Sequence, residues 1–321
     1  MFVPQLACNP PSRSVLVVLL RSIVCLALIS GFVSCQNLNA NDNRQAVVHI
    51  DSSNRAVALY ETPKRIISLA PSTTEILFEL GLGKLILAVD DQSNFPAETL
   101  QLEKLGGFQP NIERIIELEP DLVVGASIIS TSIIQQLERS GIPVWIADSS
   151  TIKGIPQMVR SLGRVLGVGL RAEAVATKID SQINDVVNRV SNLEPLTVFV
   201  ELDATDASKP YTIGPNNYLH DLIGLAGGQN VFSDAISAYP QVSLEQVIYR
   251  DPELIVLNDY IFGITRADIR QRAGWKNIEA VRTDRILEVA ANLNDRLSRP
   301  GPRVGSALEE IARFIHPDAF R

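Results

Sequence analysis

The chain has 321 residues, and 46% of them are hydrophobic, which is enough to fill the core of one large or two small domains. Its net charge of −7 argues against a nucleic-acid-binding protein, because such a protein would need a basic face. All three cysteines, Cys8, Cys25 and Cys35, lie near the N-terminus. The rest of the chain can therefore hold neither a disulfide framework nor a cysteine-based zinc site.

The N-terminal region predicts export. Basic residues precede the apolar run 23–33, which is short for a membrane span but suits the hydrophobic region of a signal peptide. The run ends at Cys35, where the sequence resembles a bacterial lipoprotein signal, so that Cys35 would carry the lipid. The alternatives are an ordinary signal peptide and an uncleaved anchor. We predict a signal peptide over 1–35 and a flexible polar tether over 36–45.

Residues 46–168 alternate between short apolar runs and segments with helical patterning. A hairpin is expected at 46–50 and 56–60, where two short runs flank a polar turn. The later strands are expected at 65–70, 85–89, 122–125 and 144–147, and the helices between them are expected to begin at Ser72 or Thr73, Asn111 and Ile133. This alternation predicts an N-terminal lobe with a parallel sheet covered on both faces.

A long helical segment separates this lobe from the last part of the chain. Apolar residues recur at helical spacing between Ala176 and Val190, and Pro195 closes the segment. We predict a rigid backbone helix over 169–194 and a C-terminal lobe over 195–321. The elements expected in that lobe are strands at 197–202, 255–257 and 286–289, helices at 218–225, near Ile269 and at 304–315, and a loop at 291–303.

Two stretches of the chain, 111–125 and 243–257, follow the same pattern without gaps. Each continues through a short helix, a proline, an acidic residue and an aliphatic strand. Each opens with a residue able to cap a helix and carries a glutamate in the first turn: Asn111 with Glu113, and Ser243 with Glu245. A match of this length predicts two similar α/β halves rather than a short-period solenoid.

Four segments, 65–83, 106–124, 239–257 and 299–317, resemble the substrate-binding proteins of bacterial ABC importers for cobalamin and ferric siderophores. They read RIISLAPSTTEILFELGLG, GGFQPNIERIIELEPDLVV, YPQVSLEQVIYRDPELIVL and RPGPRVGSALEEIARFIHP, and the binding module would span about 64–321. The resemblance implies two α/β lobes with parallel sheets, joined by one long backbone helix, with the ligand in the cleft between them. It also implies capture of a metal chelate outside the cytoplasm and delivery to a permease dimer with its ATPase subunits.

The resemblance assigns roles to individual residues. Those implied to contact the ligand are Pro71, Ser72, Thr73, Gln92, Phe108, Tyr239, Arg296 and Arg299. Tyr239 matches a position that is often aromatic and stacks on the ligand. Gln92 falls where a cobalamin binder would offer an aromatic residue, which counts against cobalamin. Glu113 and Glu245 match glutamates that dock on permease arginines, although each alone could simply be a first-turn helix carboxylate.

The nature of the ligand stays open between a corrinoid and a ferric siderophore. The aromatic residues expected in the cleft loops are Phe95, Phe108, Tyr211, Tyr218, Tyr239, Tyr260 and Phe262, and these would bury the flat parts of a chelate. The arginine pair would instead bind anionic oxygens, and each arginine could equally be a solvated loop residue. The three histidines are scattered, so we expect neither a protein-bound metal nor a cofactor.

The main alternative is an extracytoplasmic α/β enzyme that acts on a small molecule in the cleft, since many enzymes share this architecture. The sequence has no G-x-S-x-G elbow, no phosphate-binding loop and no Cys/His pair after Cys35. A lipid-tethered scaffold, the third class, would not need aromatic residues in both lobes. We therefore predict a binding protein rather than an enzyme.

Overall fold

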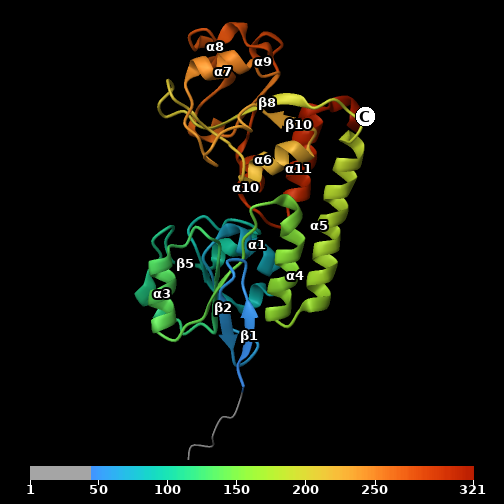
Figure 1. The fold of residues 1–321 in the computed structure, drawn as a ribbon. Coiled ribbons are helices and arrows are strands. Elements are labelled where there is room, and N and C mark those ends of the chain that lie inside the picture. The colour runs from blue at the N-terminus through green and yellow to red at the C-terminus, as the bar shows by residue number, and fades with distance from the viewer. Residues whose placement is uncertain (1–44) are drawn as a thin grey trace, which may run out of the picture. The chain divides into compact units, whose positions relative to one another are not determined.

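The computed structural model describes residues 45–321. The predicted signal peptide, the predicted lipidation site Cys35 and residues 36–44 of the tether lie outside this range. Residues 45–321 form one unit in which two α/β lobes are joined by the long helix α5 (Gly169–Val190), as Figure 1 shows. The predicted two-lobe fold with parallel sheets and one backbone helix is confirmed.

The N-terminal lobe is built on a five-stranded parallel sheet in the order β5-β4-β3-β6-β7. Its strands are β3 (Ile66–Ser68), β4 (Ile86–Val89), β5 (Glu103–Lys104), β6 (Leu122–Gly125) and β7 (Val144–Ile146). Helices α1 (Pro71–Glu79) and α4 (Ile155–Val165) share one hydrophobic core with the sheet, and α2 (Ile112–Glu117) and α3 (Thr131–Arg139) share another. The sheet is therefore buried on both faces, as its nearly continuous apolar strands predict.

The C-terminal lobe repeats this plan with the parallel order β10-β8-β11-β12. The strands are β8 (Leu196–Asp203), β10 (Gly228–Asn230), β11 (Leu254–Leu257) and β12 (Ile286–Glu288), while β9 (Tyr211–Thr212) pairs antiparallel with β8. Helices α6 (Tyr218–Leu225) and α11 (Val304–Ile315) contribute to one core, and α7 (Leu244–Arg250) and α8 (Arg266–Gln271) to the other. The short helices α9 (Glu279–Arg282) and α10 (Ala291–Ser298) complete the lobe.

Helix α5 packs against both lobes. It contacts α4 in the N-terminal lobe and α6 and α11 in the C-terminal lobe. Its apolar stripe is buried along the whole helix, and Ala172 near one end and Val190 near the other belong to the same continuous core. The spine is thus a structural part of both lobes rather than an exposed linker.

The internal repeat is confirmed residue by residue. Asn111 accepts a hydrogen bond from the backbone N–H of Arg114 at 3.0 Å, and Ser243 accepts one from Gln246 at 3.3 Å. Strands β6 and β11 then project alternate residues into two cores. Leu122 and Val124 match Leu254 and Val256 in the shared core, whereas Val123 and Ile255 point into the outer cores.

The acidic residue of each repeat copy anchors the neighbouring strand. The Asp121 carboxylate accepts from the backbone N–H groups of Lys64 and Arg65, at 2.8 and 2.9 Å, just before β3. The Glu253 carboxylate accepts from the N–H of Thr197, at 2.7 Å, near the start of β8. These bonds satisfy backbone donors at the strand ends and explain why both copies keep an acid there.

A small hairpin begins the N-terminal lobe, as predicted. Strands β1 (Val47–Ile50) and β2 (Ala56–Leu59) pair antiparallel across the turn. The carboxylate of Asp51 accepts from the N–H of Ile146, which fastens the turn to the edge strand β7. None of the helices in residues 45–321 combines the length and hydrophobicity needed to cross a bilayer.

The predicted loop at 291–303 was wrong over its first half, which forms helix α10. Leu293 and Leu297 lie four residues apart and are both buried, so they supply a one-sided apolar contact for a short helix. The segment contains no other aliphatic residue larger than Ala before Val304, and this polarity made it resemble a loop.

Candidate ligand-binding cleft

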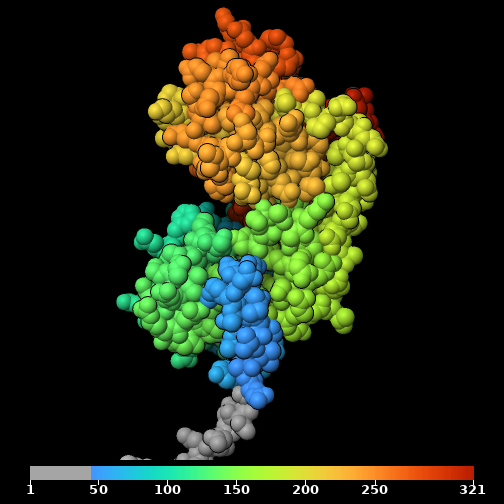
Figure 2. Space-filling view, in the orientation of Figure 1, coloured from blue at the N-terminus to red at the C-terminus, as the bar shows by residue number. Residues whose placement is uncertain are grey.

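A cleft with a volume of about 810 Å³ lies between the two lobes. Figure 2 shows the surface hollowed where the green N-terminal lobe faces the orange C-terminal lobe. Residues of both lobes line the cleft. Those of the N-terminal lobe are Leu69, Ala70, Pro71, Ser72, Asp90, Gln92, Gly107, Phe108, Pro110, Ala126, Ser127, Ile128, Ile129 and Asp148. Those of the C-terminal lobe are Tyr239, Ile261, Phe262, Asn294, Asp295, Ser298 and Arg299. Its size suits a large ligand, since clefts for small molecules usually measure about 300–1,000 Å³.

The topology of the sheets places these residues. Leu69, Gln92, Ile128 and Asp148 follow the carboxyl ends of β3, β4, β6 and β7, and Ile261 follows β11. Parallel strands bring these ends to one edge of each sheet, where open α/β proteins commonly bind ligands. The cleft is therefore formed where the two sheet edges face each other.

Large apolar side chains are exposed on both walls of the cleft. Phe108 on the N-terminal wall is 75% exposed, and Phe262 on the C-terminal wall is 76% exposed. Tyr239, Ile128 and Ile261 are also exposed and line the same space. Exposed apolar groups gathered on opposite walls indicate a ligand with flat or bulky apolar surfaces.

The loop that begins α1 brings two of its three predicted residues to the cleft. Pro71 and Ser72 line it. Thr73 is fully buried, and its hydroxyl lies 2.9 Å from the carbonyl oxygen of Ala70 and 2.7 Å from the hydroxyl of Ser68. Thr73 thus holds the loop in place from behind rather than facing the cleft.

The carboxylates on the N-terminal wall are held by local hydrogen bonds. Asp90 accepts from the hydroxyl of Ser93 at 2.5 Å and from the N–H of Gln92 at 2.8 Å. Burial nevertheless raises the pKa of Asp90, because desolvation outweighs these bonds. Asp148 accepts from the N–H of Ser127 at 3.1 Å and the N–H of Ser149 at 2.8 Å.

On the C-terminal wall, the turn that carries Ile261 and Phe262 begins at a buried carboxyl group. Asp259 is 1% exposed and neither carboxyl oxygen has a hydrogen-bond partner among the described residues. Burial, together with the nearby Glu201 carboxylate, raises the pKa of Asp259 to about 7. Glu201 is itself paired with the buried Arg272, whose Nη2 lies 2.8 Å from Oε1 of Glu201.

The two predicted arginines lie in different environments. Arg299 lines the cleft but is only 8% exposed, and its two terminal nitrogens donate to Glu75, Asn94, Gln92 and Asp295. Arg296 lies on α10 and is not part of the cleft lining; its guanidinium bonds Glu310 at 2.5 Å and the hydroxyl of Ser306 at 3.3 Å. The structure therefore does not bring the two guanidinium groups together at the ligand.

A second, polar recess of about 390 Å³ shares Ser127, Asp148, Tyr239 and Ser298 with the cleft. It is lined by side chains from both lobes, among them Asn216, Asn217, Tyr218 and Asn258. The Tyr218 hydroxyl is buried without a partner among the described residues, and burial holds its pKa far above the usual range. This recess extends the cleft toward hydrogen-bonding groups.

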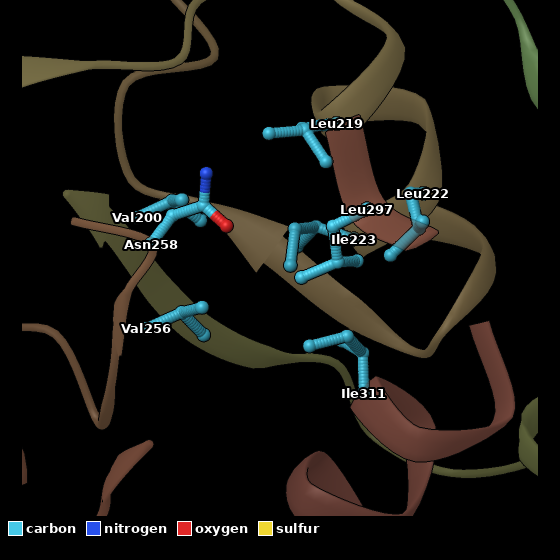
Figure 3. A pocket seen from close by; sticks show the side chains of 8 residues that line it. All are labelled: Val200, Leu219, Leu222, Ile223, Val256, Asn258, Leu297 and Ile311. Carbon is cyan, nitrogen blue, oxygen red and sulfur yellow. The ribbon is translucent and has the colours of Figure 1, made fainter. Parts of the chain in front are cut away.

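A smaller cavity lies deeper in the C-terminal lobe. Figure 3 shows its lining, which consists of Val200, Leu219, Leu222, Ile223, Val256, Asn258, Leu297 and Ile311. Its volume of about 10 Å³ is close to that needed for one water molecule. Asn258 is the only polar side chain in this lining, and Leu219, Asn258 and Leu297 also line the polar recess, so this small apolar cavity adjoins the recess.

The two matched glutamates lie on the first turns of α2 and α7. In Figure 1, α7 lies at the end of the C-terminal lobe away from the N-terminal lobe. Glu245 and Glu113 are absent from the lining of the cleft. A hydrogen bond from its own backbone N–H, aided by Ser243, lowers the pKa of Glu245, so this carboxylate is charged at neutral pH.

The residues that sequence reasoning missed are mainly Ile128, Ile261, Asn294 and Asp295. Ile128 could have been found, because it directly follows a buried parallel strand. Asn294 and Asp295 lie on α10, where a loop was expected. Of the expected aromatics, Phe95, Tyr211 and Tyr260 do not line the cleft or its polar recess. No group of three or more His, Cys, Asp or Glu residues in 45–321 is arranged to hold a metal ion.

Comparison with known proteins identifies relatives of this fold. The family model described as periplasmic binding protein matches residues 66–293. The uncharacterised ABC transporter substrate-binding lipoprotein YvrC of Bacillus subtilis is 30% identical over 278 residues, which cover 84% of this chain and 86% of YvrC. The periplasmic vitamin B12 binding protein BtuF of Vibrio cholerae has a TM-score of 0.69 and 28% identity, over 81% of this chain and 99% of BtuF. The periplasmic heme-binding protein RhuT from Roseiflexus sp. RS-1 has a TM-score of 0.70 and 26% identity, over 80% of this chain and 99% of RhuT.

Proposed function

Because the chain belongs to the periplasmic binding protein family, we propose that it is the extracytoplasmic solute-binding component of an ABC importer. It captures a metal chelate in the cleft between its lobes and delivers it to a membrane permease dimer that works with ATPase subunits. The apolar side chains exposed on both walls support this role, because they are available to a bulky ligand without any change in the core.

Within this class, the charge of the cleft favours a corrinoid. Arg299 is the only Lys or Arg among the described residues that line the cleft and its polar recess, and its terminal nitrogens already make four hydrogen bonds to protein oxygens. Asp90, Asp148 and Asp295 line the same space. An anionic siderophore would find no uncommitted cation there, whereas a corrinoid offers a large apolar ring and uncharged amides.

The side chains in the cleft also suit the amides of a corrinoid. Gln92 stands where an aromatic residue was expected for a cobalamin binder, but its amide, like that of the exposed Asn216 in the polar recess, can donate and accept hydrogen bonds. The similarity to the vitamin B12 binding protein BtuF supports the same ligand class. The proposed ligand contacts are therefore Pro71, Ser72, Gln92, Phe108, Tyr239 and Phe262. Thr73, Arg296 and Arg299 are not proposed as ligand contacts, because their side chains bond other groups of the protein.

Haem is the second candidate. The phenol of Tyr239 lies in the cleft lining and is largely exposed, and a tyrosine oxygen can serve as an axial ligand to ferric haem. The similarity to the heme-binding protein RhuT also supports this reading. Against haem, Arg299 is the only arginine in the cleft lining formed by residues 45–321, and it is already paired with protein groups rather than available to the two propionates.

We further propose that the protein binds its ligand without chemical change and that a lipid on Cys35 tethers it outside the cytoplasmic membrane. The lipoprotein relative YvrC and the sequence around Cys35 support the tether. Glu113 and Glu245, on corresponding helices of the two lobes, are proposed to dock on the permease.

Calorimetric titration of the purified protein with cyanocobalamin, ferric protoporphyrin and a ferric tricatecholate tests the ligand. Calorimetry is preferable to tryptophan fluorescence, because Trp145 and Trp275 are both buried in the cores and neither lines the cleft. Saturable binding of cyanocobalamin, tighter than that of the tricatecholate, is expected. Binding of the tricatecholate alone would refute the corrinoid assignment, and recovery of a chemically altered ligand would refute a purely binding role.

A further inference from the structure

A buried ion cluster joins the two lobes beside the cleft. Glu75 lies on α1 of the N-terminal lobe and is 4% exposed. Its carboxylate accepts from Arg299 at 3.0 Å and from Arg303 at 2.8 and 2.5 Å. Both arginines lie between α10 and α11, and α11 packs on the backbone helix α5 and on α6 of the C-terminal lobe.

The cluster takes up both terminal nitrogens of Arg299. Nη1 donates to Glu75 and to Asn94, at 3.0 and 2.8 Å. Nη2 donates to Asp295 at 2.8 Å and to the carbonyl oxygen of Gln92 at 3.3 Å. Four of the five guanidinium N–H donors therefore bond protein oxygens, and at most the Nε–H donor is available to a ligand.

Arg303, the second arginine of the cluster, bonds Glu75 and packs on an aromatic ring. Its Nε and Nη2 both bond Glu75, and its guanidinium carbon lies 4.1 Å from the centre of the Phe95 ring. It is not part of the cleft lining. Glu75 therefore bonds one arginine that lines the cleft and one that lies behind it.

We propose that Glu75 is a specificity-determining residue that excludes anionic ligands by holding the charge of Arg299 within the lobe junction. The proposal rests on the proposed function of the cleft as a corrinoid site. With Glu75 charged, the two arginines are balanced by Glu75 and Asp295, and the cleft presents no net positive charge from this cluster. Without the charge of Glu75, the cluster gains one positive charge next to the ligand, and carboxylates would be attracted to it.

A purely structural role for Glu75 predicts a different result. Loss of an ion pair between the lobes would change the free energy of lobe closure, and that change would be common to all ligands that fit the cleft. Only an effect on specificity changes the ratio of affinities for two ligands that differ in charge. The ratio is therefore the decisive readout.

The test compares cyanocobalamin with a cyanocobalamin monocarboxylic acid, in which one side-chain amide has been hydrolysed to a carboxylate. Affinities are measured by calorimetry for the wild type and for Glu75→Gln, which keeps the size of the side chain. The wild type should bind the acid no more tightly than cyanocobalamin. The Glu75→Gln variant should shift the affinity ratio toward the acid by roughly tenfold or more for at least one isomer, the usual value of one charge-assisted hydrogen bond.

Glu310→Gln is the matched control, because Glu310 pairs with Arg296 away from the cleft lining. Its affinity ratio should equal that of the wild type. Asp295→Asn provides a second route to the same effect if Glu75→Gln does not fold, since Asp295 bonds the other side of Arg299 and is partly exposed. An unchanged ratio in the folded variants would overturn the role of Glu75. Failure of the wild type to bind either corrinoid would instead overturn the proposed function.

Discussion

Glu75 and Arg299 stand more than two hundred positions apart in the sequence, yet their side chains meet at 3.0 Å where the two lobes join. Arg299 was expected to reach the ligand, and it does line the cleft, but its two terminal nitrogens bond protein oxygens. The same ion pair therefore connects the two lobes and offsets the positive charge of a residue that lines the cleft. A buried pair of this kind is costly to break, because removing one partner leaves the other charged and desolvated.

Tyr239 should be an important contact for the ligand. Tyr239→Ala is expected to weaken binding of cyanocobalamin by about 1–3 kcal/mol, the usual effect of removing a stacking or hot-spot aromatic residue. Stability should change little, because the side chain is exposed in the free protein. Titration calorimetry and thermal unfolding on the same sample measure both quantities. Tyr249→Ala is the control, since Tyr249 is 90% exposed on α7 and does not line the cleft.

The docking role of the matched glutamates predicts a separation of transport from binding. Glu113→Lys with Glu245→Lys should abolish uptake and permease-stimulated ATP hydrolysis and leave corrinoid affinity intact. The reason is that reversed charges would repel permease arginines, which slows encounter and speeds dissociation. Asp185→Lys with Glu194→Lys, at exposed positions on and just after α5, changes the net charge equally and should transport normally.

If the two glutamates serve only their helices, the outcome is different. The double variant would then transport normally and lose a modest amount of stability, about 0.3–1 kcal/mol per site, from the unfavourable charge at each helix N-terminus. Each single reversal should be milder than the double variant in the docking case, because the opposite lobe still anchors the complex.

Lipidation at Cys35 predicts where the protein is found. Cys35→Ala should release the mature protein from membranes or stall its processing, because no thiol would remain at the expected processing site. Fractionation of cells and intact-mass analysis of the mature protein measure this. Cys25→Ala, within the predicted signal peptide, should have no such effect. A mature protein cleaved elsewhere, with an unmodified Cys35, would contradict the prediction.

The buried Asp259 predicts an unusual dependence of stability on pH. Its pKa of about 7 in the folded protein lies above the value of about 3.9 expected in the unfolded chain. Between these values the folded state binds more protons, so the contribution of Asp259 to the free energy of unfolding falls as the pH rises from 4 to 7. The fall is at most about 4 kcal/mol, since one pKa unit corresponds to about 1.4 kcal/mol.

Denaturant unfolding at several pH values, compared between the wild type and Asp259→Asn, isolates this term because other carboxyl groups are common to both proteins. Asp268→Asn is the control: the hydrogen bonds from Thr265 lower the pKa of Asp268, so its contribution is lost only at more acidic pH. Parallel profiles for the wild type and Asp259→Asn would show that Asp259 is ionised in the folded protein throughout this range.

The sequence by itself determined the plan of the molecule. Period-2 and period-3.6 patterns, helix-capping residues and the repeat at Asn111 and Ser243 are local signals, because capping, strand burial and chain reversal depend on neighbouring residues. They were sufficient for two α/β lobes, a backbone helix and the equivalence of β6 with β11. They failed at α10, where only the burial of Leu293 and Leu297 against the rest of the lobe stabilises a helix in a polar segment.

The tertiary structure alone decided which side chains are free to meet a ligand. Thr73, Arg296 and Arg299 have side chains of a kind that binds ligands. In the folded protein, however, they form hydrogen bonds with Ala70, Glu310 and Glu75, respectively. A sequence gives the charge and size of a residue, whereas its availability depends on partners that folding brings from distant positions. Arg299 is therefore occupied by a carboxylate on the first helix of the opposite lobe, which no local pattern around Arg299 contains.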